Sequence, residues 1–384
     1  MRPPLPAMLL LVLLLASCGQ TAAPTVSAAR SSAAPASVTQ AASPSAAGSQ
    51  KQWDDLVAAA RQERKISVSG PASPLWRDAL TAFQKDYPDI SVEYNGGDSR
   101  DFWPKIDQER KAGQYLTDLR IGGPDPQVFD AMSRGVLDPV EPLLILPEVI
   151  DESKWLGGWQ AFYADKSKQY LPGFLADVSH PLYVNRDLVP TSKLNTERDL
   201  LDPSFKGKIV LQDPRGGAGL GFLTTFLKVD GEDFVRQLLA QQPIISSDNR
   251  QIAEWLVRGN YPAAIGLRNY DLLVFQQEGL GKNVLPAEGV KAEPLSIGSG
   301  GIQLLNKAPH PKATQLFMNW LLSAKVQESL TKAVQQDSRR TDVPPGAPDE
   351  LPDPKKMDQY VPHQTEELLA LRTQVLKIAT DALK

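Results

Sequence analysis

Stretches with helical spacing of apolar residues alternate with short strand-like runs through most of this chain. Residues 53–64 follow the helical pattern. In the next stretch, residues 65–73, the chain first alternates like a strand, and Gly70 and Pro71 then end that strand. The same order recurs at residues 74–97 and again after residue 206. Helices that alternate with short strands build largely parallel sheets covered on both faces, so we predict an α/β protein.

Small residues follow several of these predicted strands. Ser69 and Gly70 end the first strand, residues 95–97 end the second, and Gly122 and Gly123 end the third. In an α/β sheet, ligands bind beyond the carboxyl ends of the strands, which makes these positions candidate ligand contacts. Ordinary turn glycines are the alternative interpretation of each pair.

A glycine-rich loop occupies residues 212–226, between an apolar run and a helix-like stretch. A loop of this kind exposes backbone N–H groups beside the positive end of a helix dipole, which suits an anion. No Gly-Lys-Ser/Thr follows it, and its glycine spacing does not match a dinucleotide-binding motif. From the residues alone, an anion cradle and a tight turn both remain open.

The N-terminus has the features of an export signal. An apolar run at residues 8–16 is too short to span a bilayer, and small residues follow it. Residues 15–18, Leu-Ala-Ser-Cys, resemble the bacterial lipoprotein signal, which predicts a signal peptide at residues 1–17 and a lipid on Cys18, the only cysteine. Residues 18–50 then lack large apolar side chains, so we expect a disordered tether that holds an exported protein at the membrane of the cell envelope.

Composition and missing motifs exclude several functions. A net charge of −4 offers no field for nucleic acid. The sequence has neither a Gly-x-Ser-x-Gly elbow nor a His-Glu-x-x-His helix, and it shows no paired metal-ligand spacing. We therefore expect no catalysis, no cofactor and no resident metal.

Longer stretches resemble the extracellular solute-binding proteins of ABC importers, family 1. Residues 199–214 resemble the entry into the second lobe of that family, residues 306–330 and 338–343 its return into the first lobe, and residues 183–190 the crossing between lobes. This branch contains receptors for ferric iron, thiamine, polyamines and aminoethylphosphonate. The resemblance implies a type II periplasmic-binding-protein fold, in which two αβ lobes joined by a hinge close on a ligand, and a membrane permease as partner.

The resemblance also implies how the chain is divided. We expect the first lobe at residues 51–182, the second lobe at 183–297, a return segment of the first lobe at 298–343, and a Pro-rich connector with a C-terminal helix at 344–384. We expect a monomer. A protein that uses the same fold to report a ligand to a membrane signalling partner is the alternative from another class.

In iron-binding and phosphonate-binding relatives, the glycine loop of the second lobe donates backbone N–H groups to an anion. The corresponding donors here are Gly216, Gly217, Ala218 and Gly219, and Arg215 can add a charged, bidentate contact. Alternatively, Arg215 lies on the surface and pairs with a carboxylate.

The iron-binding relatives also place two adjacent tyrosines after a strand of the second lobe. Here the first tyrosine is kept as Tyr270, but Asp271 stands in the second position. Arg268 adds a positive charge that opposes a bare trivalent cation. Histidine is a further option as an iron ligand. His310, however, lies in a sequence motif of the family, Ala-Pro-His-Pro, that has a structural role. Iron held by Tyr270, Asp271 and an exogenous anion is therefore the second hypothesis.

A small organic or phosphorus-containing anion is the leading hypothesis, because it accounts for two arginines that are candidate ligand contacts, Arg215 and Arg268, together with the glycine loop. Tyr183, Tyr270 and Trp76 are candidates to stack on the ligand, with core packing as the alternative for each. Asn185 and Asn269 are candidates to orient the ligand through hydrogen bonds. Ser299, where the chain returns to the first lobe, is a candidate contact from the crossing itself.

Overall fold

The computed structural model describes residues 46–347 and 350–383, apart from the side chains of Ala46, Ala47 and Tyr270. These residues belong to one unit, residues 44–384. The predicted signal peptide, Cys18 and most of the predicted tether lie outside the described residues. No helix in the described ranges is long and apolar enough to cross a membrane.

The first sheet has four strands in the order β11-β3-β1-β2. Its strands are β1 (Lys65–Gly70), β2 (Ser91–Gly96), β3 (Leu119–Ile121) and β11 (Ile302–Leu304). Strand β1 is parallel to β2 and β3, whereas β11 runs antiparallel to β3. The helices of this part are α1 (Ala46–Glu63), α2 (Pro74–Thr81), α3 (Phe83–Asp86), α4 (Ser99–Lys111), α5 (Pro126–Ser133), α6 (Pro147–Ile150), α11 (Pro311–Leu322) and α12 (Ala324–Val334).

The second sheet has five strands in the order β7-β6-β8-β5-β9. Its strands are β5 (Leu182–Asn185), β6 (Ile209–Gln212), β7 (Ile244–Ser246), β8 (Ala263–Ile265) and β9 (Val284–Pro286). Strand β6 is parallel to β7 and β8, and β5 is antiparallel to its two neighbours. The helices here are α7 (Gly217–Asp230), α8 (Glu232–Ala240), α9 (Asn249–Val257) and α10 (Asn269–Gln277).

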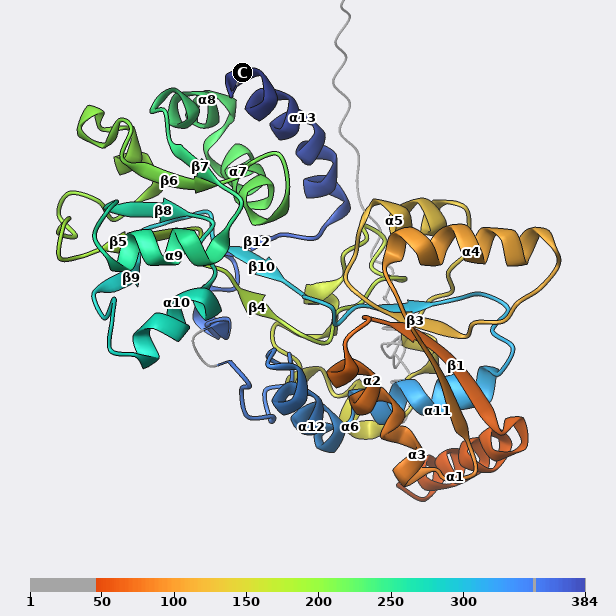
Figure 1. Ribbon diagram of the computed structural model, residues 1–384. Coiled ribbons are helices and arrows are strands. Elements are labelled where there is room, and N and C mark those ends of the chain that lie inside the picture. The colour runs from red at the N-terminus through yellow and green to blue at the C-terminus, as the bar shows by residue number, and fades with distance from the viewer. Residues whose placement is uncertain (1–45, 348–349, 384) are drawn as a thin grey trace, which may run out of the picture. The chain divides into compact units, whose positions relative to one another are not determined.

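A third, small sheet lies between the other two (Figure 1). It has the order β12-β10-β4, with β4 (Asp177–Val178), β10 (Pro294–Ser296) and β12 (Val361–Pro362). Strand β4 leads into the second sheet, β10 leads back to the first, and β12 precedes α13 (Glu366–Ala382), which packs on α7 and α8. The chain therefore crosses between two αβ lobes through this sheet.

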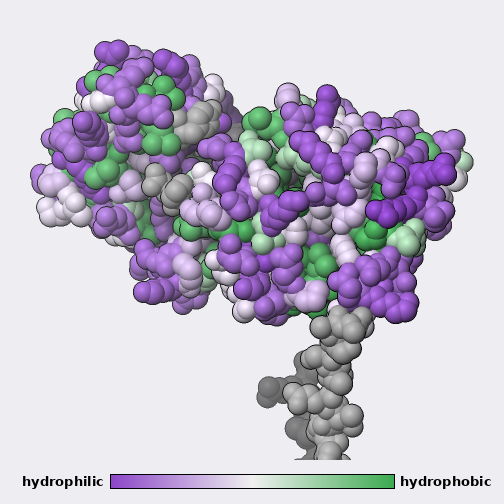
Figure 2. All heavy atoms as spheres, turned by 90° about the horizontal axis from the view of Figure 1, so that it is seen from below, coloured by the Kyte–Doolittle hydropathy of each residue, from purple (hydrophilic) through white to green (hydrophobic). Residues whose placement is uncertain are grey.

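Each lobe has its own aromatic core. Phe83 contacts Phe317 and Trp320 in the first lobe, with ring centroids 5.3 and 5.2 Å apart. In the second lobe, Phe226 packs edge-on against Phe234 at 5.6 Å. The helical spacing of apolar residues predicted these buried faces. On the face seen in Figure 2, hydrophobic side chains appear in small groups between hydrophilic ones.

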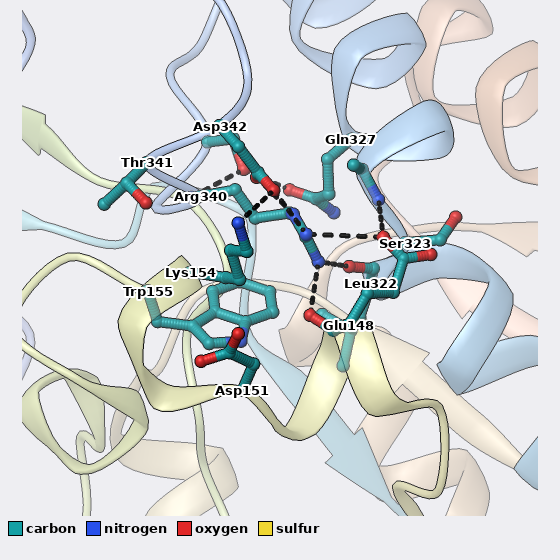
Figure 3. Close-up of polar contacts among 12 residues, drawn as sticks. Glu148, Asp151, Lys154, Trp155, Leu322, Ser323, Gln327, Arg340, Thr341 and Asp342 are labelled. Carbon is teal, nitrogen blue, oxygen red and sulfur yellow. Dashed lines mark hydrogen bonds and ion pairs between the residues drawn. The ribbon is translucent and has the colours of Figure 1, made fainter. Parts of the chain in front are cut away.

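Two buried arginines fasten the return segment to the first lobe. Arg340 donates to the backbone carbonyls of Glu148 and Leu322 at 3.1 and 3.0 Å, and it forms a bidentate pair with Asp342 at 2.9 Å (Figure 3). Arg339, also fully buried, donates to three backbone carbonyls. Because a guanidinium group has five N–H donors, it can hold several loop carbonyls at once.

Two sequence predictions change in detail. Helix α1 begins at Ala46, inside the predicted tether. Two side-chain pairs, each spanning one helical turn, stabilise its first half: Gln50 donates to Asp54 at 2.8 Å, and Lys51 pairs with Asp55. Trp76, a candidate ligand-stacking residue, is 6% exposed and lies in the core of the first lobe. Its alternative interpretation, core packing, is the one that the structure shows.

Candidate functional site

A pocket of about 490 Å³ opens where the crossing strands meet the second lobe. Strands β4, β5 and β10, the first turns of α7 and α10, and the end of α12 all contribute to it. Its lining residues are Asp177, Val178, Ser179, His180, Tyr183, Ala218, Phe222, Leu267, Arg268, Asn269, Ser296, Gly298, Val334, Gln335, Gln336 and Glu350. This pocket therefore combines the helix starts that follow β6 and β8 with the hinge.

The glycine loop ends at the first turn of α7, as the sequence predicted. Gly216 is extended, and Gly217 has a φ of +54°, a conformation that glycine adopts without a steric penalty. Gly217 and Ala218 are the first residues of the helix, so their N–H groups have no intrahelical acceptor, and they donate to no other described group. A second hollow of about 360 Å³ is lined by Gly216 and Gly217, whereas Ala218 lines the larger pocket.

Gly219 does not have the predicted donor role. Its N–H donates to the side-chain oxygen of Gln212 at 2.8 Å, so this amide is already used. A Cβ atom at Gly219 would lie 2.1 Å from the backbone oxygen of Gln212. The glycine is needed because the helix and strand backbones approach closely here.

Arg215 pairs with a carboxylate, the alternative interpretation of this residue. Its Nε and Nη2 donate to the two oxygens of Asp213 at 2.8 and 2.7 Å, and its side chain is 53% exposed. The hydrogen bonds from Arg215 lower the pKa of Asp213. The charge of Arg215 is therefore largely balanced within the loop itself.

The start of α10 shows a second internal pair. Arg268 donates to Asp271 at 2.8 Å, and the Asp271 side chain is 11% exposed. Asn269, the first residue of the helix, lines the pocket, and its hydrogen bond to a ligand stays a prediction. The side chain of Tyr270 lies outside the described residues. Asp271, a candidate iron ligand, is thus engaged by Arg268.

Tyr183 and Asn185 lie on the same strand, β5, but take different roles. Tyr183 is 2% exposed and lines the pocket. Asn185 is buried, donates to the carbonyl of Leu256 at 2.8 Å and accepts the N–H of Asp187 at 3.0 Å. The prediction that Asn185 orients a ligand is wrong, because both ends of its amide hold the second lobe together.

The candidate contacts of the first lobe do not line this pocket. The Ser69 hydroxyl accepts from Nη1 of the buried Arg120 at 2.8 Å. At Gly70, a Cβ atom would lie 2.6 Å from the hydroxyl of Tyr94, so the position is crowded. These residues still lie at the carboxyl end of β1, on the edge of the sheet where the sequence placed them.

Gly122 and Gly123 pack against the hinge. The N–H of Gly122 donates to Gly301 at 2.9 Å, and a Cβ atom at Gly123 would lie 2.4 Å from the backbone oxygen of Gly298. Gly123 therefore permits close backbone contact with the turn at Gly298. Ser299 lies in the turn after β10, next to Gly298, which does line the pocket.

The sequence analysis missed Asp177, the buried carboxylate of the pocket. Its side chain is in strand β4 and is 8% exposed. One oxygen, Oδ1, accepts the N–H of Asp337 at 3.3 Å, whereas Oδ2 forms no hydrogen bond with the described residues. Burial, with smaller contributions from Glu350 and Asp337, raises the pKa of Asp177 to about 7. An aspartate inside the apolar run of residues 174–178 was the available signal.

Histidines take structural positions. The backbone N–H and the ring Nδ1 of His310 contact the buried carboxylate of Asp118 at 2.7 and 2.8 Å, as expected for a motif with a structural role. His180 contacts Glu293 at 2.9 Å. Across residues 46–347 and 350–383, no three His, Cys, Asp or Glu side chains come together in a group that could hold a metal ion.

Several solved structures share this fold. Iron-bound HitA from Pseudomonas aeruginosa matches with a TM-score of 0.55 and 17% identity, covering 83% of this chain and 99% of that one. The Trichodesmium protein IdiA (FutA), in complex with iron and citrate, matches with a TM-score of 0.61 and 13% identity over 83% and 99% of the two chains. Apo ferric ion-binding protein A from Pasteurella haemolytica matches with a TM-score of 0.60 and 15% identity, covering 83% of this chain and 98% of that one.

These likenesses confirm the predicted type II periplasmic-binding-protein fold. A search of the curated proteins gives no match. The family model for bacterial extracellular solute-binding proteins matches residues 66–328, more than half of the chain. The chain belongs to the bacterial extracellular solute-binding proteins.

Proposed function

We propose that this protein is the substrate-binding component of an ABC importer and that it captures a small organic solute with an anionic group. The observation that supports this proposal most is the pocket between the helix starts of the second lobe and the hinge. Crossing segments are where a two-lobed protein bends, so a solute bound there can favour the closed form. The closed form then delivers the solute to a membrane permease.

Backbone amides supply the attraction for the anionic group. The N–H groups of Gly217 and Ala218 begin α7, where the helix dipole is positive. Arg215 and Arg268 are each paired with a nearby aspartate, so they contribute to the site only if those pairs open. The main-chain donors are therefore the fixed part of this subsite.

Closure requires that the solute bind the closed form more tightly than the open form. Contacts with both the second lobe and the hinge would provide that difference. We further propose that the protein is exported and held at the membrane through a lipid on Cys18, with its tether allowing it to reach the permease.

A negative charge introduced at Ala218 tests the anion subsite. An aspartate in the first turn stabilises a helix by roughly 0.3–1 kcal/mol but repels an anion bound at the same amides. The full chain is dialysed against a small-molecule extract of its own cells, and the retained solutes are identified by mass spectrometry. We expect one anionic solute to be enriched by the wild type and by Ala218→Ser, and to be lost from Ala218→Asp.

Enrichment that is equal in Ala218→Asp and Ala218→Ser would contradict the anion subsite. Genes for a permease and an ATPase beside this one would support import, whereas a neighbouring sensor kinase would support signalling.

Iron is the second candidate because the similar structures include iron-bound HitA, an apo ferric ion-binding protein and a protein in complex with iron and citrate. In this chain Tyr270, with an exogenous anion, would be the main ligand. The engagement of Asp271 by Arg268 disfavours a full iron shell. Elemental analysis of protein purified from its own cell envelope decides between the two: iron at one ion per chain would replace the organic solute.

A further inference from the structure

We propose that the pocket holds a protonated nitrogen of the solute against Asp177, so that the captured molecule has an ammonium-type group as well as its anionic one. The inference deepens the proposed function and rests on it. It follows from the position of Asp177, from the hydrogen-bond acceptors around it and from the charges that face it.

Asp177 is held at the pocket wall with one oxygen engaged and one available. Its Oδ1 accepts the N–H of Asp337, which fixes the side chain. Gly298, which lines the same pocket, has a φ of +52°, and a Cβ atom there would lie 3.0 Å from Asp177 Oδ2. A larger residue at position 298 would therefore cover the carboxylate, whereas glycine leaves Oδ2 accessible from the pocket.

A second acceptor without a donor lies at the same wall. The Oε1 atom of Gln336 is buried and has no hydrogen-bond partner among the described residues. The Nε2 atom of that amide would lie 2.7 Å from a Cβ atom at Gly298, which places Gln336 beside the glycine and Asp177. Two acceptors that lack donors call for a ligand with several N–H groups.

The charges that act on Asp177 are also negative. Glu350 lines the pocket and Asp337 is adjacent, and both oppose a charge on Asp177. Among the described residues, no lysine or arginine forms an ion pair with Asp177. A buried carboxylate is costly unless it is paired, so a cationic group of the solute is the missing partner.

The other titratable groups of the pocket are engaged elsewhere. His180 contacts Glu293, and Arg268 pairs with Asp271. Tyr183 and Phe222 add aromatic rings to the lining of the pocket. Carbon atoms between the two charged groups of a solute would pack there.

Protonation of Asp177 competes with this binding. Burial raises the pKa of Asp177 to about 7, so at neutral pH part of the population is uncharged. A bound cation favours the charged form, so binding releases protons near neutral pH. Affinity for a cation falls as the pH decreases through the pKa of Asp177.

The test uses two small probes of similar shape. Propylammonium chloride and 1-propanol are titrated separately into the full chain, and the amide NMR signals of Gly298 and Asp337 are followed. We expect propylammonium to shift these signals with millimolar affinity at about pH 8, to bind about tenfold or more weakly at about pH 5.5 and in Asp177→Asn, and propanol to leave them unchanged.

Asp55→Asn, which changes an exposed aspartate outside the pocket, is the matched control, and it should keep both the binding and its pH dependence. Propylammonium that leaves these signals unchanged, or that binds Asp177→Asn as tightly as the wild type, would overturn the inference. If the inference is overturned in this way but the dialysis experiment still enriches an anionic solute, the proposed function stands without it. If no solute is enriched, the proposed function fails with it.

Discussion

Asp177 should reduce the stability of the solute-free protein, and Asp177→Asn should therefore stabilise it. Burial raises the pKa of Asp177 from 3.8 to about 7. The folded state thus binds this proton more tightly than the unfolded state does. The resulting cost is absent below the unfolded pKa, grows as the pH rises from 3.8 toward 7, and is complete above that value.

The size of this cost follows from the shift. A change from 3.8 to about 7 corresponds to about 4 kcal/mol at about pH 8, at 1.36 kcal/mol per pKa unit. An asparagine keeps an oxygen to accept the N–H of Asp337 but has no charge to bury. We expect Asp177→Asn to raise the free energy of unfolding by about 2–4 kcal/mol at about pH 8 and by much less at about pH 4.

Urea unfolding followed by circular dichroism measures both values in dialysed, solute-free protein, because a bound solute would stabilise the wild type. Asp55→Asn is the control: this aspartate is 67% exposed, and the loss of its surface pair should change stability by less than about 1 kcal/mol. A loss of stability in Asp177→Asn at about pH 8 would show that the carboxylate serves the fold, which would refute the reasoning.

Three further predictions concern the scaffold. Burial, with a smaller effect of a nearby arginine, lowers the pKa of His363 from 6.5 to about 4, so its stabilising contribution is complete above pH 6.5 and is lost as the pH falls toward 4. Between about pH 8 and about pH 5 the wild type should lose about 2 kcal/mol more stability than His363→Gln, and equal losses would contradict this pKa. In urea unfolding, Gly219→Ala should lower the free energy of unfolding by about 1–3 kcal/mol, because the added Cβ would collide with backbone atoms. Gly97→Ala should be nearly neutral, because a Cβ there would meet open space, and equal effects of the two substitutions would contradict the close contact at Gly219. Arg340→Ala should lower the unfolding free energy by about 3–5 kcal/mol, whereas the exposed Arg236→Ala should cost less than about 1 kcal/mol, and a small loss at Arg340 would argue against its fastening role.

The pattern of apolar residues was sufficient to predict the main elements. The apolar run at residues 209–212 is strand β6, and the glycine loop leads directly into α7. The helix at residues 311–322 has apolar residues at helical spacing, and it buries Leu316, Phe317, Trp320 and Leu321. Such periodicity reports burial directly, because one face of each element must leave water.

The site was harder to predict because its residues depend on contacts that sequence spacing does not reveal. Asp177 became a candidate only when the fold brought Asp337 and Glu350 beside it. Arg215 and Arg268 each turned to an aspartate two or three residues away, and the choice between that partner and a ligand depends on side-chain conformation. The side chain of Asn185 donates to a backbone carbonyl of its own lobe, that of Leu256.

A crystal structure of the chain loaded with its retained solute tests the central claim most directly. We predict one solute in the pocket, with its anionic group at the first turn of α7, beside the N–H group of Ala218, and its protonated nitrogen at Asp177 Oδ2. A solute bound away from this pocket, or one that leaves both the start of α7 and Asp177 without contact, would contradict the account.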